Sequence, residues 1–68
     1  MARRVRIETS AQAAAARERL RGLEERFRAC VDQASARLLA REIIGLHMAL
    51  TSYALRIEMR AIHDHQAG

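Results

Sequence analysis

Two histidines near the C-terminus have a spacing that can support chemistry in this 68-residue chain. His63 and His65 form a His-x-His pair, which can chelate a metal ion weakly through two imidazole nitrogens. A structural zinc site is closed by four ligands, and two histidines in a terminal segment do not supply them. We therefore expect a solvated polar tail over residues 63–68 and no metal site.

The other reactive side chains fit structural roles better than catalytic ones. His47 lies within an apolar segment, where we expect its imidazole to make a polar contact at an interface. Cys30 is the only cysteine, and its thiol is expected to act as a small apolar side chain. Glu24 and Glu25 are followed by arginines, as on an ion-paired surface. The sequence predicts no catalytic residue, no cofactor and no small-molecule substrate.

Length and composition indicate a small helical protein. Half of the residues are hydrophobic, proline is absent and only three residues are glycine. A chain of this size buries only about 60% of the surface that it exposes when unfolded, so its own core is marginal. The single cysteine excludes an intramolecular disulfide and favours a reducing compartment. We predict an all-α fold that is completed by oligomerisation or by a partner.

The chain divides into an arm, a helical domain and the polar tail. Residues 1–9 form a flexible basic arm. Thr9 and Gln12 then have the spacing of a capping box, in which a hydroxyl and a glutamine side chain satisfy free amides at a helix start. We expect the helical domain over residues 10–62. Its alanine-rich start either projects from the core or packs closely against another backbone.

A possible turn at residues 32–36 separates two arrangements of this domain. Asp32 and Ser35 have short polar side chains that can cap a second helix, although no glycine or proline marks the turn. An antiparallel helical hairpin and one continuous helix of about fifty residues, roughly 80 Å long, are both compatible with the pattern. We prefer the hairpin.

Residues 39–62 have helical periodicity with apolar side chains on two neighbouring faces. The first stripe contains Leu39, Ile43, Leu46, Leu50, Tyr53 and Ile57. The second stripe contains Ile44, Met48, Leu55, Met59 and Ile62. One stripe is enough for a hairpin, so we predict that the two stripes form a partner interface with another copy or a larger protein. This favours a non-enzymatic interaction protein, such as a subunit, an adaptor or a chaperone-like protein.

The arginines of the arm support an alternative function. All twelve basic residues are arginine, and the formal net charge is +4. The possible nucleic-acid contacts are Arg3, Arg4 and Arg6. Residues 3–9 resemble the N-terminal strand of ribbon-helix-helix repressors, where strands from two subunits pair in the major groove. The resemblance implies Arg4, Arg6 and Glu8 on DNA, Val5 and Ile7 in the core, and a small dimeric nucleic-acid-binding regulator.

A second resemblance concerns the apolar segment itself. Residues 42–60 are similar to the C-terminal helix of flagellar and type III secretion rod proteins, which implies a component of a secretion apparatus. The uncharged run 43–55 spans about 20 Å as a helix, whereas a bilayer core requires roughly 30 Å. Residues 1–9 lack the apolar core of a secretory signal. We expect no membrane span and a cytoplasmic location.

Overall fold

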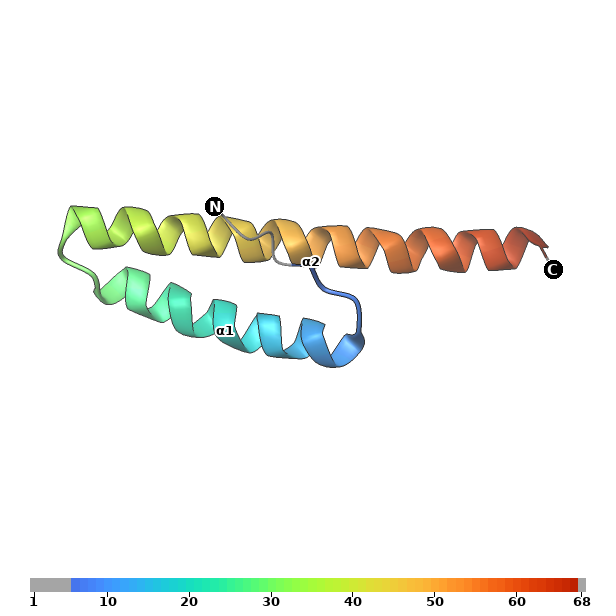
Figure 1. Ribbon diagram of the computed structural model, residues 1–68, viewed down its shortest axis with the longest axis horizontal. Helices are drawn as coiled ribbons and strands as arrows, with labels where there is room; N and C mark the ends of the chain where they lie inside the picture. The colour runs from blue at the N-terminus through green and yellow to red at the C-terminus, as the bar shows by residue number, and fades with distance from the viewer. Residues whose placement is uncertain (1–5, 68) are drawn as a thin grey trace.

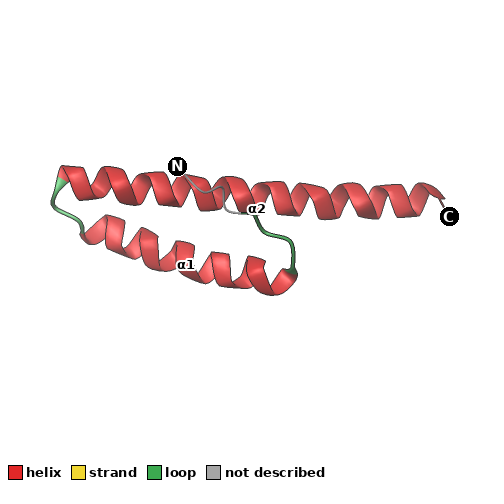
Figure 2. Cartoon of the chain, in the orientation of Figure 1, coloured by secondary structure: helices red, strands yellow, loops and turns green. Residues whose placement is uncertain are grey.

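Two antiparallel helices joined by a short loop make up the fold. The computed structural model describes the backbone of residues 6–67 and the side chains of residues 6–64. Helix α1 spans Ser10–Ala29 and helix α2 spans Gln33–Ala67 (Figures 1 and 2). The predicted all-α hairpin is confirmed, and the alternative of one continuous helix is excluded.

Helix α1 begins at the predicted capping box. The Thr9 hydroxyl accepts a hydrogen bond from the Gln12 amide at 3.1 Å, and the Gln12 side-chain oxygen accepts from the Thr9 amide at 3.2 Å. The same oxygen accepts from the Glu8 amide at 2.7 Å. Three amides that have no partner within the helix are thereby satisfied, which sets the start of α1 at Ser10.

The loop covers residues 30–32, at the N-terminal edge of the predicted turn 32–36. Cys30 leaves the helix in an extended conformation, and Val31 at the tip is fully exposed. Asp32 starts α2, because its carboxylate accepts hydrogen bonds from the Ser35 hydroxyl at 2.8 Å and the Ser35 amide at 3.0 Å. These two hydrogen bonds lower the pKa of Asp32, and the bond from the Ser35 hydroxyl has the larger effect.

Helix α2 continues beyond the predicted end of the helical domain. The polar residues after Ile62 were expected to form a tail, but the helix runs through Ala67. The prediction took the end of the apolar pattern as the end of the helix. Where apolar side chains stop, burial stops, but the helix itself ends only at a residue that breaks or caps it. Residues 63–67 include neither glycine nor proline, so nothing in them breaks the helix.

One thin apolar layer holds α1 against α2. The buried residues of this layer are Ile7, Ala13, Ala16, Leu20, Leu23 and Leu46. Partly buried side chains of α2 pack against it, namely Leu39, Ile43, Ala49, Leu50 and Tyr53. The buried alanines of α1 lack bulky side chains, so the alanine-rich start packs closely in the hairpin and does not project from it.

The end of the arm closes the open end of the hairpin. Ile7 is only 2% exposed, and its carbonyl oxygen accepts a hydrogen bond from the guanidinium of Arg56 on α2. The segment from Ile7 to the start of α1 therefore crosses from α2 to α1, as Figure 1 shows. Ile7 therefore packs inside its own hairpin.

Helix α2 is much longer than the helix that covers it. Its 35 residues span about 52 Å, against about 30 Å for the 20 residues of α1. Every residue of 54–64 is exposed. The radius of gyration is 15.2 Å, whereas a compact domain of this length has about 11 Å. We call residues 54–64 the overhang.

Candidate interaction surface

The first stripe lies largely inside the hairpin. Leu46 is 5% exposed, and Leu39, Ile43, Leu50 and Tyr53 pack against the core. The sequence pattern placed these residues in an interface with a partner, but α1 of the same chain covers them. Leu46 was expected to contact a partner, and it instead packs inside its own hairpin. Ile57 continues this stripe past the end of α1 and remains 49% exposed.

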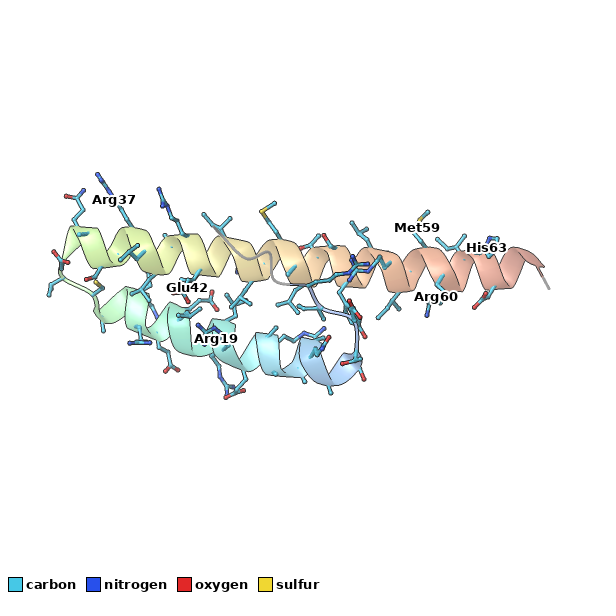
Figure 3. All side chains as sticks on the ribbon, viewed as in Figure 1. Arg19, Arg37, Glu42, Met59, Arg60 and His63 are labelled. Carbon is cyan, nitrogen blue, oxygen red and sulfur yellow. The ribbon has the colours of Figure 1, made fainter. Side chains whose placement is uncertain are left out.

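The second stripe is uncovered along its whole length. All of its members are more than half exposed, with Met48 and Met59 at 66%. In Figure 3, Met59 points away from α1, and so does Arg37 at the other end of the helix. The stripe extends over nineteen positions, from Ile44 to Ile62, which is about 27 Å of helix. It is the part of the predicted interface that stays available to another molecule.

An ion pair to α1 lies on the covered side of α2. Glu42 lies toward α1, where its carboxylate is 3.1 Å from the guanidinium of Arg19 (Figure 3). Both side chains are more than half exposed, so this pair adds little stability. The apolar face that remains free is opposite.

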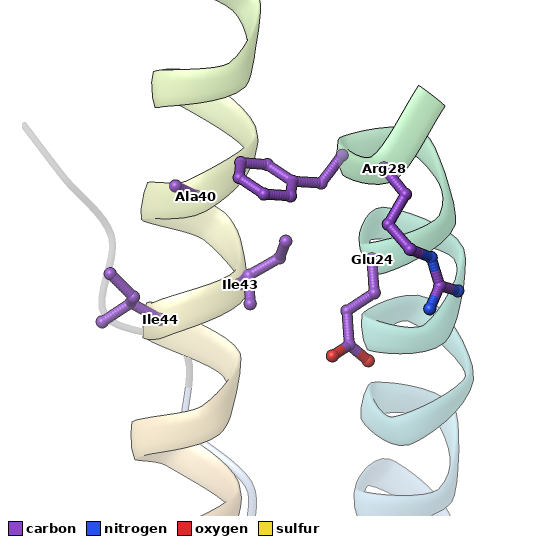
Figure 4. Close-up of a pocket in the computed structure, with 6 residues that line it drawn as sticks. Glu24, Arg28, Ala40, Ile43 and Ile44 are labelled. Carbon is purple, nitrogen blue, oxygen red and sulfur yellow. The ribbon is translucent and has the colours of Figure 1, made fainter. Parts of the chain in front are cut away.

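An open hollow of about 370 Å³ lies between the helices near the loop (Figure 4). Its lining residues are Glu24, Phe27, Arg28, Ala40, Ile43 and Ile44. The two charged groups have opposite signs and both come from α1, while α2 contributes only apolar side chains. A small-molecule site usually has a few polar groups that converge on the ligand, and this hollow lacks them. It instead connects the apolar surface of Ile43 with that of Ile44.

No metal centre is formed by the residues that the structure describes. Within residues 6–64, no three histidine, cysteine or acidic side chains come together in a way that can hold a metal ion. His63 and His47 are both exposed, and Cys30 is a free thiol whose sulfur donates to the Asp32 carbonyl at 3.2 Å. Neither described helix contains a stretch apolar and long enough to cross a bilayer.

The predicted nucleic-acid contacts lie in and beside the described arm. Arg6 is exposed and forms an ion pair with Glu8 at 3.4 Å. Arg3, Arg4 and Val5 lie outside the described residues. Ile7 does face a core, as the ribbon-helix-helix resemblance implies, but that core belongs to its own hairpin. Contact between the arm and nucleic acid stays a prediction.

Comparison with known proteins gives no relative from which a function could be carried over. The chain matches no protein-family model, no curated protein and no solved structure. The geometry of the hairpin is therefore the basis for a functional assignment. Its most distinctive feature is the uncovered second stripe.

The sequence left open the place of three residues that determine this geometry. Ala13 and Ala16 are buried against α2, and Ile7 closes the end of the layer. Alanines do not stand out in an apolar pattern, because alanine is equally common on exposed helix faces. The ribbon-helix-helix resemblance implied a core position for Ile7, and it did not indicate that this core would be that of the same hairpin.

Proposed function

We propose that this chain is a non-enzymatic protein-interaction module whose docking surface is the second stripe of α2. The observation that carries the proposal is a continuous row of large apolar side chains, each more than half exposed, on a helix whose opposite face is already covered. Monomeric proteins rarely expose contiguous apolar patches of this extent unless another molecule covers them. The proposal includes a role as a subunit, adaptor or chaperone-like protein in the cytoplasm.

The surface area of the chain supports the same proposal. The accessible surface is 6082 Å², which is ~1,800 Å² more than the roughly 4,300 Å² expected for a compact monomer of 7.7 kDa. A standard interface removes about 800 Å² from each partner. The excess is therefore large enough for an interface of ordinary size on α2.

The mode of recognition that this surface fits is packing of one helix against another. The second stripe is straight, one side chain wide and flanked by polar residues, as on helices that lie in a groove or in a coiled coil. Its two methionines add adaptable side chains that tolerate imperfect complementarity. An apolar helix is thus the expected binding partner.

Site-specific photo-crosslinking in the cell that produces the protein tests this proposal. A benzoylphenylalanine at position 48 should yield a discrete cross-linked protein species, and the same probe at Glu25, an exposed position of α1, should not. Absence of a discrete species from position 48, or the same species from both positions, would contradict the proposal. Replacing Arg3, Arg4 and Arg6 with alanine should leave the cross-link unchanged, whereas its loss would favour the nucleic-acid regulator.

A further inference from the structure

We infer that the molecule covering the second stripe is a second copy of this chain, packed α2 against α2 in antiparallel orientation. This inference rests on the proposed function and names its partner. It follows from the order of the residues in the stripe, from the polar groups beside the stripe and from the length of the overhang.

The second stripe has nearly the same residue order in both directions. Read from either end it begins with isoleucine followed by methionine, with Leu55 near the middle. The midpoint of Ile44 and Ile62 and the midpoint of Met48 and Met59 both lie between residues 52 and 54. A two-fold axis perpendicular to α2 at this level therefore places each isoleucine of one copy opposite the other isoleucine of the second copy. The methionines match in the same way.

The centre of the stripe has room for the side chain that the symmetry places there. Thr51 and Ser52 are exposed on the same side of α2, and they face Leu55 of the second copy in this register. In a coiled coil, a side chain such as leucine inserts into a hole formed by four residues of the facing helix. The small side chains at positions 51 and 52 therefore leave space that Leu55 of the second copy fills.

Polar groups beside the stripe match in the same register. His47 and Glu58 lie on one flank of the stripe, and their midpoint also falls between residues 52 and 54. The two-fold axis places the imidazole of His47 next to the carboxylate of Glu58 in the second copy, and the reverse contact repeats it. Both side chains are exposed, and neither takes part in an ion pair among the described residues. A parallel arrangement would instead place these flanks of the two copies on opposite sides of the interface, so His47 and Glu58 would not meet.

The overhang is covered in this arrangement. Residues 54–64 of one copy pack along residues 42–52 of the other, on the face of α2 opposite α1. Each chain then loses exposed apolar surface from both halves of the stripe. Two free α2 ends become one antiparallel coiled coil with a hairpin at each end, and an isologous interface closes without leaving a copy of the stripe free.

Sedimentation equilibrium of the full chain over a wide concentration range is the first test. The wild-type protein should have twice the mass of 7.7 kDa and dissociate on dilution, and Met48→Asp should shift the equilibrium at least tenfold toward the monomer. A helical monomer at every concentration would overturn this inference. It would leave the proposed function intact, because a cross-link from position 48 to a different protein would remain possible to observe.

Disulfide trapping measures the orientation and remains informative if Met48→Asp does not fold. With Cys30→Ser as background, Ile44→Cys and Ile62→Cys are made in separate chains. The antiparallel register predicts that a mixture of the two variants forms a cross-linked heterodimer on oxidation, whereas either variant alone gives little cross-linked product. Efficient cross-linking of Ile44→Cys to itself would indicate a parallel dimer and would overturn the inference.

A charge-swap pair tests the flanking contacts. His47→Glu places two carboxylates side by side in each of the two symmetric contacts and should weaken the dimer by about 2- to 5-fold per contact. Adding Glu58→Arg in the same chain should restore the affinity of the dimer. A single variant that dimerises as well as the wild type, or a double variant without recovery, would contradict this register.

Discussion

Two parts of α2 with similar side chains differ in whether α1 covers one of their faces. In residues 33–53, Leu46 is 5% exposed because α1 covers it, whereas Leu55 in the overhang is 55% exposed. The same contrast separates Ile7 at 2% from Ile57 at 49%. The amino-acid type therefore does not decide which apolar residue forms the core. The length of α1 and the path of the arm decide it, and the remaining apolar residues are left exposed.

The largest expected effect comes from a charge on the covered face. Leu46→Asp buries an unpaired carboxylate in the hairpin and should cost about 4 kcal/mol or more. A domain of this size has a total stability of about 3 to 10 kcal/mol, so most of the helical circular dichroism should be lost. Met48→Asp is the matched control on the free face and should keep its helicity in dilute solution. Equal loss in both variants would show that the two faces do not differ.

The next effect compares two isoleucines under one substitution. Ile7→Ala removes a buried side chain and should lower the free energy of unfolding by about 2 to 4 kcal/mol. Ile57→Ala should change it by less than about 0.5 kcal/mol, because the side chain is half exposed. Urea unfolding of both variants, each at a concentration where it is monomeric, gives the two values. Similar values would mean that the arm is not part of the folded unit.

The cap of α2 should have a smaller, pH-dependent effect. The folded-state pKa of Asp32 is lowered by the hydrogen bonds from Ser35, so its stabilising contribution is present above the unfolded-state pKa and disappears as the pH falls through the folded-state pKa. Asp32→Ala should therefore lower Tm by a few degrees at pH 7 and by less at pH 3. Thermal denaturation at the two pH values tests this. A difference between variant and wild type that grows as the pH falls would contradict the assignment.

The smallest effect concerns the ion pair between the helices. A double-mutant cycle with Arg19→Ala and Glu42→Ala should give a coupling energy of about 0.2 to 1 kcal/mol, reduced by added salt, because both side chains are largely exposed. The same cycle on Arg21 and Glu18, which pair within α1, is the control for a pair that does not join the helices. A coupling well above this range would make the ion pair, rather than the apolar layer, the main link between α1 and α2.

Local signals in the sequence predicted the parts of the fold that depend on neighbouring residues. Thr9 and Gln12 gave the start of α1, and Asp32 and Ser35 gave the start of α2, because a cap is made within four residues. The two stripes of α2 were also visible. Their spacing could not tell which stripe would meet α1, since both consist of large apolar side chains with the same period.

The parts that depend on distant contacts were not predictable from pattern alone. The docking of Ile7 joins residues that are far apart in the chain, and the burial of Ala13 follows from close approach of two helices. No glycine or proline marks the loop at residues 30–32, so the predicted turn 32–36 began only at the last residue of that loop. The continuation of α2 to Ala67 was hidden by polar residues that are exposed but still helical.

The contact between Ile7 and Arg56 also orders the events of folding. It joins residues 49 positions apart, whereas capping and the start of each helix involve neighbours within one turn. Long-range contacts form late because the entropy of closing the intervening chain opposes them. During synthesis the arm is made before α2, and Ile7 cannot form this contact until residue 56 has been made. The arm is therefore made before both helices but can dock only after most of α2 is present.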